Sequence, residues 1–305
     1  MRRMRISPRA YERITIVAVA MLAAIIVTGT AVRLTGSGLG CPDWPNCEPG
    51  SLVPREATNA HAMVEFVNRV VTGLVSVAVI LAVLGSLLRR PRRRDLTWLS
   101  AGLVVGVLAQ AVLGGLVVKF GLEPPFVMAH FLLSMVLLTN AVVLADRARR
   151  PEGQGRSVVS RSVVVLARLL LVALVGVLVA GTVVTATGPH GGDEEAERFG
   201  FALPDVTRVH AVAALAYVAL IVAIFFVLDR RGAPDEVRRR LSVVLVVALA
   251  QAAVGYVQYF NDIPELLVGI HVAGATALAA ATIWFYLGLF AVTRPVEREP
   301  LTALA

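Results

Sequence analysis

The chain has 305 residues, of which 57% are hydrophobic and only 16% are charged, and its mean hydropathy is +0.76. This composition excludes a soluble domain and indicates a membrane protein with several spanning segments. The formal net charge is +8, but the arginines lie in short loops between apolar runs, which argues against nucleic acid as a partner.

Eight apolar segments are each long enough to cross a lipid bilayer as a helix. They are expected near 14–32, 63–88, 96–118, 126–145, 163–184, 207–228, 241–260 and 265–291. An arginine-rich stretch precedes the first segment, and no clean small-residue cleavage site follows it. We therefore predict a membrane helix there rather than a signal peptide.

The loops between these segments alternate in charge. Arginines gather in the N-terminal stretch and in 89–94, 147–161 and 230–240. Acidic residues lie in the alternate loops, 33–61, 119–125, 185–206 and 261–264. By the positive-inside rule we predict a multi-pass protein of the plasma membrane, with both termini cytoplasmic and the acidic loops outside.

The sequence repeats one four-helix unit. Gln110 and Gln251 lie 141 residues apart in similar surroundings, and so do His130 and His271. A second shared motif lies earlier in each half. Gly29-Thr30 followed by Thr35-Gly36 in the first half recurs as Gly181-Thr182 followed by Thr187-Gly188 in the second. An even number of helices per half gives both halves the same direction through the membrane, so a pseudo-twofold axis along the membrane normal is expected. We predict an all-α membrane protein of eight transmembrane helices in two tandem four-helix bundles, divided into residues 1–150 and 151–305.

Three histidines, His130, His210 and His271, are expected at similar depth near the outer face. An ionisable residue in a membrane helix is costly to desolvate and suggests function, the alternative being a simple hydrogen bond to a neighbouring helix. His210 and His271 begin two helices of one bundle, and facing histidines in a bundle core can hold haem iron from both sides. Zinc is less favoured because further ligands are wanting nearby.

The first half departs from the second at one position. After a one-residue loop change, the repeat aligns Asn68 with His210. Asparagine is a poor ligand for haem iron, so His130 is the clear axial candidate in this half, and one iron position could stay open.

A stripe of polar residues, His61, Glu65, Asn68 and Arg69, shares one face of the second helix. Either Glu65 and Arg69 form an ion pair that neutralises itself, or the carboxylate faces a pocket and the arginine reaches a carboxylate of a ligand. His61 lies about two turns above Asn68 and is expected at the pocket mouth. In the second half, Arg208 could pair with a haem propionate or extend to the membrane interface.

The chain has two cysteines, Cys41 and Cys47, in one loop that is predicted to lie outside. A pair in a short external loop favours a disulfide that closes a small ring. A structural bridge and a redox role both remain open, and metal binding is a weaker alternative.

On these features the chain resembles the heme A synthase family, whose members are membrane enzymes that oxidise a methyl group of heme O to the formyl group of heme A. The resemblance covers nearly the whole chain. It rests on the two four-helix repeats, the cysteine pair, the element Glu65-Phe66-Val67-Asn68-Arg69, and the histidines at positions 130, 210 and 271. The family's pattern has histidine where this chain has Asn68.

The resemblance implies successive hydroxylations of heme O for cytochrome oxidase biogenesis. Residues 151–305 would hold a resident haem b through His210 and His271, with Arg208 beside it. Residues 1–150 would receive heme O at a site made by His130, Asn68, Arg69 and His61, with Glu65 and His130 as the catalytic pair. The implied partners are heme O, heme O synthase, an electron donor and the lipid bilayer.

Two other functions compete with this one. A non-enzymatic di-haem electron carrier would need ligands at both membrane faces, whereas every candidate ligand is expected near the outer face. A transporter is suggested by the repeats, but it would need broken helices near the membrane midplane, and three of the expected spans, 14–32, 163–184 and 207–228, contain no proline.

Overall fold

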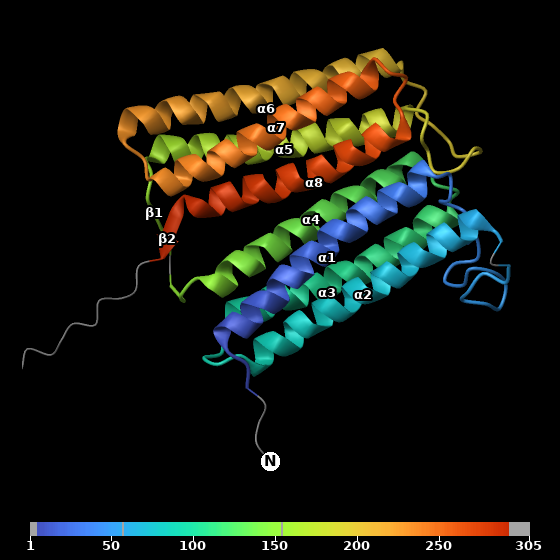
Figure 1. The fold of residues 1–305 in the computed structure, drawn as a ribbon, viewed down its shortest axis with the longest axis horizontal. Coiled ribbons are helices and arrows are strands. Elements are labelled where there is room, and N and C mark those ends of the chain that lie inside the picture. Colours follow the sequence, from blue (N-terminus) through green and yellow to red (C-terminus); the bar gives the residue numbers. More distant parts are fainter. Residues whose placement is uncertain (1–4, 57, 154, 293–305) are drawn as a thin grey trace, which may run out of the picture.

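The computed structural model describes residues 5–56, 58–153 and 155–292 (Figure 1). Its helices are α1 (Pro8–Leu34), α2 (Ala60–Leu88), α3 (Arg94–Lys119), α4 (Pro124–Arg149), α5 (Arg161–Thr187), α6 (Leu203–Arg231), α7 (Asp235–Tyr259) and α8 (Glu265–Gly288). Within the described ranges, these eight helices are long and apolar enough to cross a membrane. The predicted number and order of spans are confirmed, and the chain is a multi-pass membrane protein.

Local signals in the sequence set several helix ends. The side chain of Ser7 accepts a hydrogen bond from the Ala10 N–H before α1, and Asn59 does the same for Ala62 before α2. Such caps satisfy backbone N–H groups that have no partner inside the helix. At the other end of α6, Gly232 adopts a φ of 64°, which a glycine accommodates without strain.

The helices form two groups of four that lie side by side, α1 to α4 and α5 to α8 (Figure 1). In each group consecutive helices pack together and the first also packs against the last. The groups meet where α8 lies against α1 and α4, and where α5 lies against α4. Buried Ile26, Met135 and Leu138 join the core of the second group across this interface. The pseudo-twofold relation between the groups, and the functional division after residue 150, stay predictions.

A small sheet outside the bundles was not predicted. The eighth span was expected to reach residue 291, but α8 ends at Gly288, and β2 (Phe290–Val292) pairs antiparallel with β1 (Gly155–Ser157). The predicted all-α class is confirmed, and this pair of three-residue strands lies outside the helices. Strands of three residues are too short to show a hydrophobic period in a sequence, and they form here because each supplies the other's backbone hydrogen bonds.

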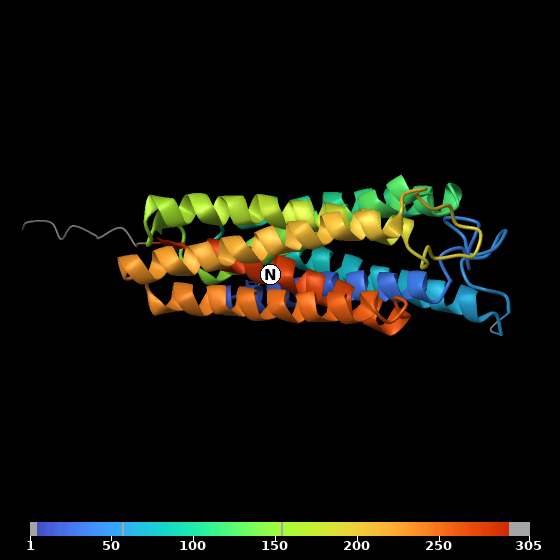
Figure 2. The same cartoon turned by 90° about the horizontal axis from the view of Figure 1, so that it is seen from above.

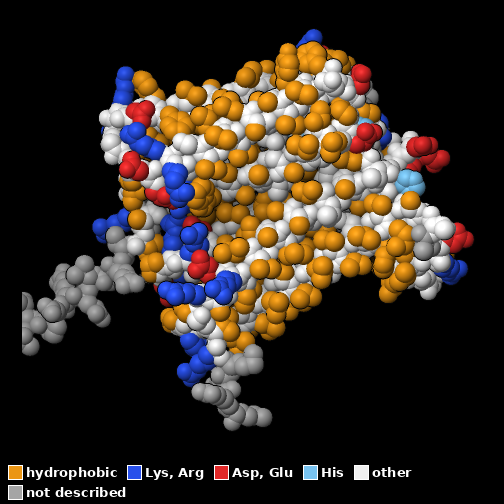
Figure 3. Space-filling view, in the orientation of Figure 1, with side chains coloured by type: hydrophobic (Ala, Val, Ile, Leu, Met, Phe, Trp, Pro, Cys, Tyr) orange, Lys and Arg blue, Asp and Glu red, His pale blue; other side chains and the backbone are white. Residues whose placement is uncertain are grey.

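The surface divides into a band and two ends. Hydrophobic side chains cover the middle in Figure 3, and basic side chains gather at the end that carries the β1–β2 sheet, whereas acidic side chains lie at both ends. The long loops 35–59 and 188–202 both lie at the end opposite the sheet (Figure 2). Exposed side chains such as Val105, Leu215 and Val246 are those expected to face lipid.

Backbone and side-chain contacts join the two halves at the loop end. The Gly38 N–H donates to the Gly192 carbonyl at 2.8 Å, and Arg33 donates to the His190 carbonyl at 2.9 Å. The His190 ring in turn lies 2.7 Å, Nε2 to O, from the carbonyl of Ile263. His190 therefore links the loop after α5 to the loop before α8, which holds the start of α8 in place.

Candidate functional site

The structure brings His210 and His271 together in the second half. His210 is the eighth residue of α6 and His271 is the seventh residue of α8. Their ring centroids are 6.2 Å apart and the ring planes meet at 73°. Metal–imidazole nitrogen bonds are about 2 Å long, so the rings are far enough apart for one metal ion to lie between them.

The half-buried rings of His130, His210 and His271 each lie against a glycine on a neighbouring helix. The pairs are His130 on Gly114, His271 on Gly255 and His210 on Gly181. A Cβ built on any of these glycines would lie 3.1 to 3.2 Å from the ring's Cε1 atom. A larger residue would therefore push the ring away. The first two glycines occupy equivalent positions of the repeat, 141 residues apart, as do the histidines that they face.

The ring nitrogens of these histidines are largely without protein partners. The Nδ1 atoms of His130 and His271 are buried and make no hydrogen bond to any described residue. His210 Nδ1 lies 3.1 Å from the Val177 carbonyl oxygen. Buried polar atoms without a partner call for an explanation, and neutral imidazole is a common metal ligand. The donor chemistry of the pair therefore fits haem iron.

The first half has a single histidine of this kind. Gln110 donates to the His130 carbonyl at 3.0 Å and to Ser134 Oγ at 2.6 Å, which ties α3 to the histidine's own helix, as expected of an interhelical amide. Asn68 lies on α2, and its Oδ1 atom is 2.8 Å from the hydroxyl oxygen of Thr28 on α1. The asparagine is thus held by α1.

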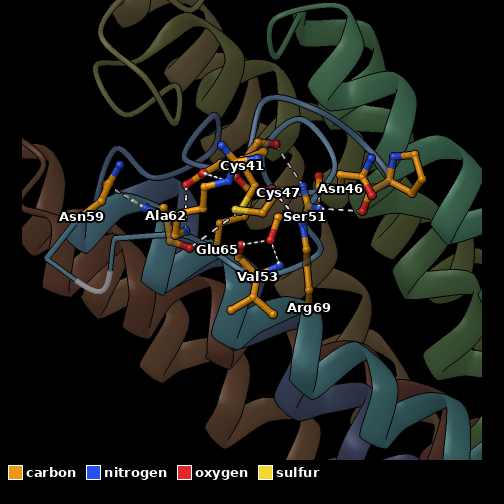
Figure 4. Close-up of a disulfide and its surroundings, with 12 residues drawn as sticks. Cys41, Asn46, Cys47, Ser51, Val53, Asn59, Ala62, Glu65 and Arg69 are labelled. Atoms are coloured by element: carbon orange, nitrogen blue, oxygen red, sulfur yellow. Dashed lines mark hydrogen bonds and ion pairs between the residues drawn. A yellow bond between two sulfur atoms is a disulfide. The ribbon is translucent and has the colours of Figure 1, made fainter.

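Glu65 and Arg69 both form hydrogen bonds with the loop that contains Cys41 and Cys47, here called the cysteine loop (Figure 4). Glu65 is only 7% exposed, and its carboxylate accepts from the Cys41 N–H at 2.7 Å and from Arg69 at 2.6 Å. Arg69 also donates to the carbonyls of Cys41, Pro45 and Asn46. The ion pair between Glu65 and Arg69 is observed, and a contact of either side chain with a ligand stays a prediction. The loop carbonyls could not be predicted as partners of Arg69 from the sequence, because every residue carries a backbone carbonyl.

The cysteine loop covers the end of the first bundle. Cys41 and Cys47 form a disulfide, as predicted, and both are fully buried. The Trp44 ring between them packs on Gly115 of α3, where an added Cβ would lie 2.7 Å from the ring. Gly115 directly follows Gly114, the glycine beneath His130. The loop therefore reaches from α2 to the segment of α3 against which the ring of His130, on α4, lies.

Two predicted site residues lie apart from these buried positions. His61 is exposed, and its Nδ1 atom is 3.0 Å from Ser37 Oγ. The Arg208 side chain is 78% exposed and pairs with Asp205 at 3.2 Å. Both lie at the loop end of the molecule, and their contacts with a ligand stay predictions.

We expect the Cys41–Cys47 bridge to persist in the protein isolated from membranes, because both sulfurs are buried in the loop that Glu65 and Arg69 hold. Peptide mass mapping with cleavage at Asp43, which lies between the two cysteines, should recover one cross-linked species under non-reducing conditions and two separate peptides after reduction. Recovery of both thiols in free form from freshly isolated membranes would contradict the bridge.

Gly255→Val is expected to displace His271 and weaken haem binding in the second half, because the new side chain needs space that the ring occupies. Disturbing the orientation of a metal ligand typically costs about 10- to 100-fold in affinity. Gly176→Ala is the matched control, since a Cβ there meets no atom within 4 Å. Haem titration followed by absorbance measures both, and equal affinities would show that the glycine does not position the ring.

Comparison with known proteins agrees with these features. The COX15-CtaA family model, described as cytochrome oxidase assembly protein, matches residues 12–189. A heme A synthase of Lysinibacillus sphaericus is 32% identical over 123 residues, which are 40% of this chain and 39% of that protein. A heme A synthase of Bacillus pumilus is 30% identical over 138 residues, 45% of this chain and 44% of that protein. The aligned segments span less than half the length of these relatives. Because the family model covers more than half of the sequence, the chain belongs to the COX15-CtaA family of cytochrome oxidase assembly proteins.

Proposed function

We propose that this protein is a heme A synthase, which oxidises a methyl group of heme O to a formyl group by two hydroxylations and loss of water, for cytochrome oxidase biogenesis. The observation that carries the proposal is the pair of facing rings of His210 and His271, 6.2 Å apart, in a chain of this family. The relatives that bear the name heme A synthase support it.

In this proposal residues 151–305 hold a resident haem b. His210 and His271 are its two ligands, and the carbonyl of Val177 orients the His210 ring through Nδ1. A haem bound in this way supplies one-electron transfer. Arg208 offers a cation to a propionate at the rim, once it gives up its exposed pair with Asp205.

Residues 1–150 receive heme O in the same proposal. His130, seated on Gly114, is its protein ligand, and Asn68 lies at the position that corresponds to the second ligand. Glu65, on α2 of this half, carries a buried negative charge and can hold or move a proton beside the heme O site. Arg69 and the cysteine loop shield the site from water. Trp44 of this loop packs on Gly115 of α3, next to the glycine that the His130 ring contacts. His61 stands at the mouth.

The proposed location is the plasma membrane, with both termini in the cytoplasm. The arginine-rich end of the molecule supports this orientation (Figure 3). Heme O is a membrane-soluble substrate, so heme O synthase and a membrane electron donor are the proposed partners.

A non-enzymatic electron carrier between the two membrane faces is disfavoured by one feature. His130, His210 and His271 all lie within the first eight residues of their helices, α4, α6 and α8. These helix starts share one end of the molecule, opposite the β1–β2 sheet (Figure 1). Haems bound there would not connect the two faces.

The test is co-expression of the full chain with a heme O synthase in a host that makes no heme A, followed by chromatography of extracted haems. We expect heme A and a hydroxylated intermediate to appear, and neither to appear with the empty vector. Accumulation of heme O alone, with the protein present in the membrane and its low-spin haem intact, would refute the proposed activity.

A further inference from the structure

A contact between α1 and α2 distinguishes the two halves of the repeat. In the first half, Thr28 Oγ1 lies 2.8 Å from Asn68 Oδ1 and 3.3 Å from the carbonyl oxygen of Ile25. The threonine hydroxyl therefore stands between the asparagine side chain and a backbone carbonyl of α1.

The equivalent positions in the second half are filled differently. The motif shared by α1 and α5 is displaced by 152 residues, which aligns Ile25 with Val177 and Thr28 with Ala180. There the His210 ring itself makes the contact, with Nδ1 3.1 Å from the Val177 carbonyl. Ala180 has no hydroxyl that could compete for this carbonyl. The first half thus has the pair Thr28 and Asn68 at the positions where the second half has the pair Ala180 and His210.

The glycine that faces the ring is present in both halves. A Cβ on Gly181 would lie 3.1 Å from the His210 ring, whereas a Cβ on the equivalent Gly29 meets no atom within 4 Å. The backbone of α1 thus still has the shape that accommodates a histidine at position 68. A histidine at position 68 would need the Ile25 carbonyl for its Nδ1 atom. Around this carbonyl the two halves differ in the side chain at position 28, which is threonine where the second half has alanine.

We infer that Thr28 is a positioning residue that, together with Asn68, makes the first half a one-histidine haem site. Its single hydroxyl proton is shared between Asn68 Oδ1 at 2.8 Å and, more weakly, the Ile25 carbonyl at 3.3 Å, so the hydroxyl holds the Asn68 amide against α1 and lies beside the carbonyl that a histidine at position 68 would need. A haem iron held by His130 would then have one protein ligand and would be able to bind a small diatomic molecule. This inference rests on the proposed function, because it takes haem as the ligand of the first half.

The probe is ferric haem b, added to the purified full chain in detergent, with electron paramagnetic resonance of the oxidised state and carbon monoxide binding after reduction. For the unchanged protein we expect low-spin haem in the second half and high-spin, carbon monoxide-binding haem in the first. Asn68→His combined with Thr28→Ala should convert the first-half haem to low spin and abolish carbon monoxide binding. Asn68→His alone should leave a high-spin fraction, because Thr28 still blocks the orienting carbonyl.

Ala180→Thr is the matched variant in the second half. It introduces the competing hydroxyl beside the Val177 carbonyl and should weaken haem binding there by about 10- to 100-fold, as is typical when a metal ligand loses its orienting hydrogen bond. Thr28→Ala alone should keep the first-half haem high-spin. The low-spin signal of the second half reports that the first-half variants are folded.

Three results would overturn the inference. The first is a low-spin haem in the first half of the unchanged protein. The second is that Asn68→His converts the first-half haem to low spin equally well with and without Thr28→Ala. The third is that Ala180→Thr binds haem in the second half as tightly as the unchanged protein does. Any of these would make the Thr28–Asn68 contact an ordinary packing contact between helices. Heme A output is measured separately with heme O as substrate. If no heme A forms but the spectra are as expected, the proposed enzyme activity is refuted and the one-histidine haem site is not. A first half that takes up no haem overturns both.

Discussion

His210→Ala and His271→Ala are each expected to abolish the low-spin spectrum of the resident haem b, whereas His130→Ala should leave most of it intact. The two rings face each other 6.2 Å apart in one bundle, while His130 lies against Gly114 in the other bundle. Loss of either facing ligand leaves the iron with one protein bond and a changed spin state.

The measurement is the reduced-minus-oxidised absorbance spectrum of each purified variant, normalised to protein. Val209→Ala serves as the control, since this side chain is 64% exposed and lies next to His210 in the chain. If His130→Ala removed the resident haem while both second-half variants kept it, the assignment of resident and substrate haems to the two halves would be reversed.

Glu65→Gln is expected to lower heme A output by about 100-fold or more, in the range of a lost proton-transfer group, and to leave the resident haem b bound. Glutamine is close in shape and can still accept the hydrogen bond from the Cys41 N–H. It removes the negative charge that pairs with Arg69. The variant thus separates the charge of Glu65 from its hold on the loop.

Glu65→Ala removes both properties and should also loosen the cysteine loop. Glu48→Gln is the control, because Glu48 is in the same loop and pairs with the exposed Arg55. Extracted haems are quantified as heme O, hydroxylated intermediate and heme A, and limited proteolysis reports the order of the loop. Normal heme A from Glu65→Gln, together with a loosened loop in Glu65→Ala, would reduce Glu65 to an anchor of the disulfide loop.

The sequence was sufficient for the membrane architecture, because its signals are local and periodic. The length of each apolar run fixes a membrane-spanning helix, and all eight appear in the structure. The arginines mark one end of the molecule, and the repeat identifies His130 and His271 as equivalent. The Cys41–Cys47 bridge could also be predicted, since both cysteines lie in one short loop.

Tertiary structure alone decided how these residues are held. Arg69 meets backbone carbonyls of the cysteine loop, each histidine ring lies on a glycine of another helix, and Thr28 contacts Asn68 across 40 residues of chain. Backbone carbonyls are common to all residues, and a glycine's neighbour depends on which helices pack together, so neither leaves a pattern in the sequence. The same holds for the β1–β2 pair, whose strands are joined only by the fold.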